Sequence, residues 1–172
     1  MTAQASPRAF PLSPVAAGLL LAIGIMIADQ ATKWGILHLF ANGPRTIEIL
    51  PFLNIVLVWN TGVSFGLFSS GERWILIGLV CLIAAGLTFW LFRIDRRPLA
   101  LAVGSVIGGA IGNVIDRIVH GAVVDFVDIY VGDWHWPAFN VADSAIVIGA
   151  GLLLLDSLFA EDKSPKKDAE DG

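Results

Sequence analysis

The chain has 172 residues, of which 56% are hydrophobic and only 15% are charged, and its mean hydropathy is +0.75. Roughly a quarter of the residues in a water-soluble domain are charged, so this composition excludes an ordinary soluble enzyme. The net charge of −4 adds little because several acidic residues lie near the C-terminus, and no basic face for nucleic acid appears. We predict a single polytopic membrane domain over residues 1–160, followed by a disordered cytoplasmic tail at 161–172.

Four segments are long and apolar enough to cross about 30 Å of hydrocarbon, which takes roughly 20 apolar residues in a helix. They are predicted at residues 15–37, 74–92, 99–119 and 139–159. Residues 46–59 lie between the first two and are interrupted by Pro51 and Asn54. Their β-branched side chains favour short strands at the membrane surface. The N-terminal apolar run continues without a convincing cleavage site, so we do not expect a cleaved signal peptide.

The basic residues predict the orientation of these spans. Arg93, Arg96 and Arg97 crowd the short turn between the second and third spans, and three lysines follow the fourth. The longer connecting segments carry few basic residues. Because lysine and arginine are retained on the cytoplasmic side, both termini should be cytoplasmic and both longer segments should face outside.

At the end of the first span, Asp29 and Lys33 are four residues apart and share a helix face. Two interpretations are open. They form a structural ion pair, with Lys33 snorkelling to the interface, or Asp29 supports a functional site.

The third span carries Gly104, Gly108 and Gly112, one every fourth residue, which lets another helix approach closely. Directly after this ridge come three polar residues, Asn113, Asp116 and Arg117. An arginine there could clamp a carboxylate or a substrate carbonyl with its planar donors. A purely structural network is the alternative.

Asp125 and Asp143 are the most informative residues. Each lies beside or within apolar sequence, where an ionisable group is costly and often functional. Asp143 lies in the first turns of the fourth span, at a depth that water can reach. Among the neighbouring acids, Asp133 is best interpreted as an exposed loop carboxylate. Two carboxylates that meet at one membrane face suggest an acid/base pair that shares a proton.

Two other features carry less weight. Residues 62–66 spell G-x-S-x-G around Ser64, but no histidine has a convincing position opposite this serine, so a serine mechanism is disfavoured. Cys81 is the one cysteine and lies in an apolar run, as a structural residue would. No cysteine and histidine spacing typical of a metal site appears.

Four motifs together resemble the signal peptidase II family, the bacterial lipoprotein signal peptidases, which are membrane aspartic proteases. The motifs are DQATKW at residues 29–34, NTGVSFG at 60–66, GGAIGNVIDRIVHGAVVDFVD at 108–128 and FNVADSAI at 139–146. The third is highly specific, whereas the first alone would be weak. One departure is Ser64, where alanine is expected in much of the family.

The resemblance implies that Asp125 and Asp143 are the catalytic dyad. It implies supporting roles for Asp29, Asn60, Asn113, Asp116, Arg117 and Asn140. It also implies a small β-cradle at residues 46–59 and, before Trp136, a helix lying on the membrane. The expected fold class is therefore all-α, with four membrane helices, an extracytoplasmic β-cradle and an interfacial helix.

The expected substrates are prolipoproteins, cleaved just before a cysteine that carries diacylglycerol. We expect no metal or organic cofactor, no nucleic-acid partner, a monomer surrounded by membrane lipids, and an active site at the outer face of the bacterial inner membrane. The alternative function is a small ion-coupled carrier, which would also place carboxylates at membrane depth. Such carriers usually show internal repeats and helices interrupted near the midplane, and neither is visible.

Overall fold

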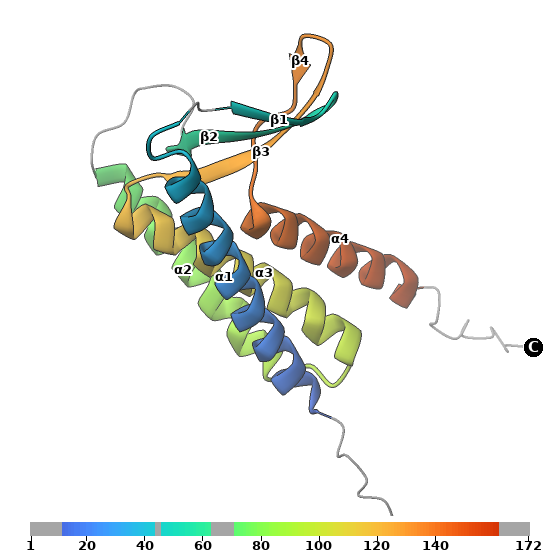
Figure 1. The fold of residues 1–172 in the computed structure, drawn as a ribbon. Helices are drawn as coiled ribbons and strands as arrows, with labels where there is room; N and C mark the ends of the chain where they lie inside the picture. The colour runs from blue at the N-terminus through green and yellow to red at the C-terminus, as the bar shows by residue number, and fades with distance from the viewer. Residues whose placement is uncertain (1–11, 44–45, 63–70, 162–172) are drawn as a thin grey trace, which may run out of the picture.

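The computed structural model describes residues 12–43, 46–62 and 71–161. Four long helices lie below a small sheet at one end of the molecule (Figure 1). They are α1 (Pro14–Leu39), α2 (Gly71–Leu91), α3 (Arg97–Val119) and α4 (Val141–Glu161). All four are long and apolar enough to cross a membrane. They confirm the four predicted segments, although α2 ends one residue earlier and α4 begins two residues later than predicted. Most of the predicted tail, and Ser64 in the G-x-S-x-G sequence, lie outside the described residues.

Helix α3 is the centre of the bundle and contacts the other three helices. Its glycines allow this: a Cβ at Gly104 would collide with the backbone of Gly18 in α1, and one at Gly108 with the backbone of Ala22. A Cβ at Gly109 would meet the backbone of Ala142 in α4. The predicted ridge of small residues is therefore a surface of close approach to α1, and Gly109, outside that ridge, allows the same for α4.

The sheet has four antiparallel strands in the order β1-β2-β3-β4. They are β1 (Thr46–Leu50), β2 (Leu53–Asn60), β3 (Val123–Val131) and β4 (Trp134–His135). Strands β1 and β2 confirm the prediction of short strands at residues 46–59. Strand β3 pairs with β2 in a register that places Asp125 opposite Val58 and Val123 opposite Asn60. This pairing brings a segment after α3 back to a segment after α1.

The prediction of an interfacial helix before Trp136 is wrong. That stretch forms β3 and β4, which pair Val131 with Trp134 across a two-residue turn. Gly132 in this turn has a φ of 59°, a conformation that glycine adopts without strain. The β-branched residues of 123–131 favour a strand, and pairing with β2 satisfies their backbone groups. As predicted, Asp133 is exposed in the turn.

Phe139 connects the sheet to the last helix. Its carbonyl accepts hydrogen bonds from the backbone N–H groups of Phe126 and Val127, at 3.1 and 2.8 Å. Its own N–H donates to the carbonyl of Val127 at 3.1 Å. Because Phe139 lies two residues before α4, these bonds fix the start of α4 beside the middle of β3.

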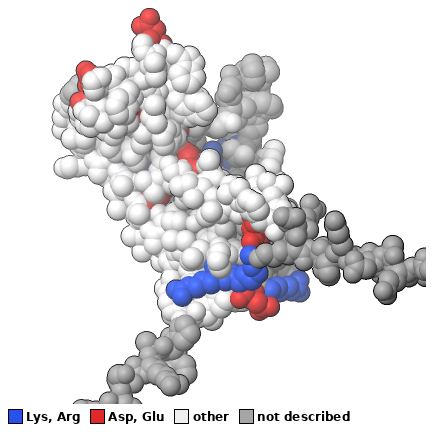
Figure 2. Space-filling model, turned by 90° about the vertical axis from the view of Figure 1, so that its right-hand side faces the viewer, with Lys and Arg blue, Asp and Glu red and all other residues white. Residues whose placement is uncertain are grey.

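Charge is distributed unevenly along the molecule. Figure 2 shows Lys and Arg side chains gathered at the end opposite the sheet, where the turn between α2 and α3 carries Arg93, Arg96 and Arg97. On the face shown, the surface between this end and the sheet is largely uncharged. Many large apolar side chains of α2 and α4 are exposed, as expected for helices that contact lipid.

Candidate active site

Asn140 is the residue before α4 and caps its N-terminus. Its Oδ1 accepts a hydrogen bond of 2.9 Å from the backbone N–H of Asp143, and Asp143 Oδ2 accepts one of 3.2 Å from the backbone N–H of Asn140. This reciprocal pairing is a capping box, which satisfies backbone donors that a helix start leaves free. The start of the helix therefore holds the Asp143 carboxylate in place.

Asp125 approaches the same cap from β3. It is 1% exposed, and both of its carboxylate oxygens accept hydrogen bonds from amides. Asn140 Nδ2 donates to Oδ1 at 2.7 Å, and Asn60 Nδ2 donates to Oδ2 at 2.8 Å. Asn140 thus contacts both carboxylates and links Asp125 in the sheet to Asp143 in the helix.

The environment of Asp125 makes its carboxyl a weaker acid than that of a free aspartate. Burial raises the pKa of its carboxyl to about 6, and the negative charge of Asp143 acts in the same direction. Hydrogen bonds from Asn60 and Asn140 and the charge of Lys33 oppose this rise. Asp143 is only partly buried and lies in the first turn of α4. The two carboxyls therefore lie in different electrostatic environments.

Asn113 supports Asp143 from α3. Its Nδ2 donates a hydrogen bond of 2.8 Å to Asp143 Oδ1. With the bond from the Asn140 backbone, each oxygen of the Asp143 carboxylate has a donor. The side chain of Asp143 is therefore oriented by groups from two different elements.

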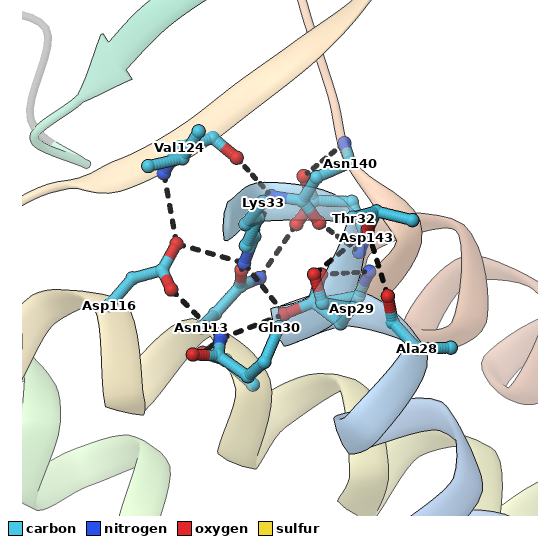
Figure 3. Close-up of polar contacts among 12 residues, drawn as sticks. Ala28, Asp29, Gln30, Thr32, Lys33, Asn113, Asp116, Val124, Asn140 and Asp143 are labelled. Atoms are coloured by element: carbon cyan, nitrogen blue, oxygen red, sulfur yellow. Dashed lines mark hydrogen bonds and ion pairs between the residues drawn. The ribbon is translucent and has the colours of Figure 1, made fainter. Parts of the chain in front are cut away.

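Lys33 lies beneath this site and is 1% exposed. Its Nζ lies 2.8 Å from Asp29 Oδ2, 2.9 Å from Asp116 Oδ2 and 3.0 Å from Asn113 Oδ1 (Figure 3). The predicted pairing of Asp29 with Lys33 is confirmed. The expectation that Lys33 snorkels to the interface is wrong, because three acceptors inside the bundle use all three donors of its ammonium.

The two carboxylates that bind Lys33 also hold backbone next to the aspartate pair. Asp29 Oδ1 accepts a bond of 2.9 Å from the N–H of Ala142, the residue before Asp143. Asp116 Oδ2 accepts one of 3.0 Å from the N–H of Val124, the residue before Asp125. Gln30 links them, because its Nε2 donates to Asp116 Oδ1 at 2.9 Å and to Asp29 Oδ2 at 3.2 Å.

Arg117 lies one turn beyond Asn113 on α3. Its Nη1 donates to the carbonyl of Asn113 at 3.3 Å, and its buried Nε has no acceptor among the described residues. The negative charges of Asp143 and Asp125 act on its guanidinium. Arg117 therefore supplies positive charge beside the pair but makes no direct hydrogen bond to either carboxylate within the described chain.

Two cavities meet at this site. One, of about 580 Å³, is lined largely by apolar residues along the start of α4, with Asp143 in its wall. The other, of about 360 Å³, lies against β2 and includes Asn60, Thr61 and Asp125. Pro137 and Ala138 line both, so each carboxylate borders a different cavity and the two cavities adjoin.

All eight residues singled out in the sequence occur in or around this cluster. Sequence reasoning missed the position of Lys33, the contribution of Gln30 and the capping role of Asn140. The spacing Asn-x-x-Asp before an apolar run is a signal for a helix start that could have identified the cap. Within the described residues, no group of three or more His, Cys, Asp or Glu side chains is arranged to hold a metal ion.

Comparisons with known proteins identify the family of this chain. The model of the family described as signal peptidase (SPase) II matches residues 21–159. A lipoprotein signal peptidase of Methylobacterium sp. (strain 4-46) is 42% identical over 166 residues, which cover 94% of this chain and 100% of the relative. A protein of the same name from Vibrio parahaemolyticus is 40% identical over 84% of this chain and 89% of its own length.

Solved structures are similar as well. A bacterial membrane enzyme determined by the in meso method at 2.3 Å resolution has a TM-score of 0.72 and 30% sequence identity. The match covers 90% of this chain and 94% of that structure. The sequence similarity, the four membrane helices and the small sheet lead to one conclusion: the chain belongs to the signal peptidase II family of bacterial membrane proteases.

Proposed function

We propose that this protein is an aspartic endopeptidase that removes the signal peptide of prolipoproteins by cleaving just before a diacylglyceryl-modified cysteine. The observation that carries the proposal is the pairing of Asp125 and Asp143 through Asn140, with each carboxyl in a different electrostatic environment. Paired titratable groups whose environments separate their protonation states are typical of acid/base catalysis. Family membership supports the substrate class, because the curated relatives are named lipoprotein signal peptidases.

In this mechanism Asp143 is ionised and acts as the general base. It takes a proton from a water molecule, whose oxygen attacks the carbonyl carbon of the scissile peptide bond. Asp125 starts protonated and donates a hydrogen bond to the carbonyl oxygen, where negative charge develops. As the C–N bond breaks, a proton passes from the pair to the leaving amine, and the new carboxyl group retains the oxygen from water.

The two adjoining cavities suit a substrate that is part peptide and part lipid. The polar cavity beside Asp125 and Asn60 would hold the peptide backbone, whose carbonyl and amide groups need hydrogen-bonding partners. The apolar cavity along α4 would hold acyl chains, with Asp143 at the boundary between them. Because α4 crosses the membrane, the lipid would stay in the bilayer while the peptide bond meets water.

We place the active site at the extracytoplasmic face and both termini in the cytoplasm. The arginines gathered opposite the sheet support this orientation by the positive-inside rule. The catalytic pair is built from one chain, which supports a monomer as the active unit. Cysteine labelling of single-cysteine variants at residue 133 and in the turn between α2 and α3 tests the orientation, because only the former should react from outside.

The decisive experiment compares Asp125→Asn, Asp143→Asn and Asp133→Asn in cleavage of a diacylglyceryl-cysteine precursor. Removing the proton-transfer group at either member of the pair should lower kcat roughly 10²- to 10⁴-fold. The exposed Asp133 provides the same chemical change outside the site and should retain activity. Full activity in Asp125→Asn or Asp143→Asn would contradict the dyad. An inactive parent that instead moves ions in proteoliposomes would support a carrier.

A further inference from the structure

We propose that Lys33 is a positioning residue for the aspartate pair: it fixes the orientation of the Asn113 side-chain amide and thereby the hydrogen bond that Asn113 donates to Asp143. This inference rests on the proposed function. Lys33 itself lines neither of the two cavities, so it acts through Asn113 and not on substrate.

The orientation of the Asn113 amide follows from donor and acceptor chemistry. An ammonium can only donate, so the group of Asn113 that lies 3.0 Å from Lys33 Nζ must be its carbonyl oxygen. The Nδ2 group then faces Asp143 Oδ1 at 2.8 Å. A flipped amide would turn N–H groups towards the ammonium and an oxygen towards the carboxylate, which replaces two attractions by two repulsions.

A further contact of Asn113 connects Lys33 indirectly to Asp125. Asn113 Oδ1 also accepts a hydrogen bond of 3.3 Å from Asn140 Nδ2, the same group that donates to Asp125 Oδ1. The fixed amide of Asn113 therefore contacts both Asp143 and the residue that bridges the pair. One ammonium thus influences the hydrogen bonds of both carboxyls.

Lys33 can hold this position because it is anchored. Asp29 and Asp116 bind its ammonium at 2.8 and 2.9 Å, and the side chains of all three are at most 2% exposed. Because these side chains are almost fully buried, no solvent-facing position competes for the ammonium. A long flexible side chain is thereby converted into a fixed donor.

Lys33 also affects the pair through its charge. The charged groups around the pair are Asp29 and Lys33 from α1, Asp116 and Arg117 from α3, Asp125 from β3 and Asp143 from α4. Lys33 lowers the pKa of Asp125, opposing the effect of burial. Removing this cation should therefore raise the pKa of Asp125, so that Asp125 stays protonated to a higher pH.

The test is the steady-state kinetics of Lys33→Met, which keeps an unbranched apolar side chain up to the ε position and removes the charged ammonium with its donors. Losing control of a hydrogen bond to a charged group should lower kcat roughly 10- to 100-fold. KM should change little because Lys33 lies outside both cavities. The alkaline limb of the pH profile should move to higher pH, a shift that a loss of stability alone would not produce.

Gln30→Met is the matched control. Gln30 contacts Asp29 and Asp116 like Lys33, but it makes no hydrogen bond to Asn113. This variant should lose stability, but it should lower kcat less than Lys33→Met does, and its alkaline limb should stay at the wild-type pH because the charge of Lys33 is retained. If Gln30→Met and Lys33→Met changed kcat and the pH profile equally, Lys33 would have only a structural role and the proposal would be overturned.

A second variant guards against failure to fold. Lys33→Met leaves two buried carboxylates without a cation, whereas Lys33→Met combined with Asp29→Asn keeps the net charge of the Asp29, Lys33 and Asp116 cluster at −1, as in the wild type. Its kcat should be roughly tenfold below that of Asp29→Asn alone. An equal kcat would overturn the proposal, and so would a double variant that fails to fold while Asp29→Asn folds. An inactive wild type, or an active Asp125→Asn, would refute the proposed function instead.

Discussion

The two ends of the helix bundle hold ion pairs of opposite character. At the sheet end, Lys33 contacts Asp29 and Asp116 at 2.8 and 2.9 Å, with all three side chains at most 2% exposed. At the other end, Arg96 makes two hydrogen bonds of 2.6 and 3.0 Å to Asp156, with side chains 60% and 24% exposed. By geometry alone the exposed, bidentate pair is the better one.

Burial makes the loss of one partner more costly at the sheet end than at the other end. An exposed pair that loses one partner is solvated by water, whereas a buried pair leaves an uncompensated charge. A buried ion pair is nevertheless weak evidence for net stability, because desolvation of the charges offsets much of their attraction. The pair at the sheet end is therefore best understood through what it positions: the backbone on the N-terminal side of both Asp125 and Asp143.

Asp116→Ala should have the largest effect on stability. It removes one carboxylate from Lys33 and the acceptor for the buried N–H of Val124. Breaking a buried pair on one side costs about 3–5 kcal/mol of folding free energy. Reversible unfolding from mixed micelles measures this value. Asp116→Asn, which keeps an acceptor for Val124, should lose less, and an equal loss would show that the hydrogen bond to Val124 contributes nothing.

The helices were predictable from the sequence because the signal is local. A long, mostly apolar segment and the glycine ridge of Gly104, Gly108 and Gly112 are properties of continuous stretches of sequence, and the four helices and the close helix approach are confirmed. Strand β3 was not recognised as a strand. Its partner β2 lies some 65 residues earlier, and the pairing that stabilises β3 cannot be read from either segment alone.

The contacts around Lys33 could likewise be predicted only in part, because some of them join residues far apart in the sequence. The pairing of Asp29 with Lys33 follows from their spacing on one helix, but the contacts of Lys33 with Asp116 and Asn113 depend on how α1 meets α3. Without those acceptors, a lysine near a helix end is expected to reach for the interface. The catalytic roles of Asp125 and Asp143 stay predictions that the substitutions described above test.

The pH dependence tests the difference between the two carboxyls at the sheet end. Because the pKa of Asp125 is raised to about 6, this group is protonated below that pH and loses its proton as the pH rises. If Asp125 is the acid, kcat/KM of the free enzyme should fall as the pH rises through about 6. Initial rates over a range of pH with a short lipidated precursor measure this limb.

Asn60→Ala sharpens that test. Its Nδ2 donates to Asp125 Oδ2 at 2.8 Å, and this bond opposes the rise in the pKa of Asp125. Without it the pKa should rise further, and the limb should move to higher pH even if the overall rate falls. A limb that moves to lower pH would mean that a group other than Asp125 controls this part of the profile.

Asp156→Ala should have the smallest effect, although it removes the shortest ion-pair contact among the described residues. The Arg96 side chain is 60% exposed, so water can solvate its guanidinium once the carboxylate is gone. We expect a loss of at most about 1 kcal/mol in unfolding free energy and no change in kcat, since the pair lies at the end of the bundle opposite the sheet. A loss as large as that in Asp116→Ala would show that membrane lipids shield the Arg96 pair from water. The two ion pairs would then have similar strength, and they would differ only in that the pair at the sheet end holds the backbone beside Asp125 and Asp143.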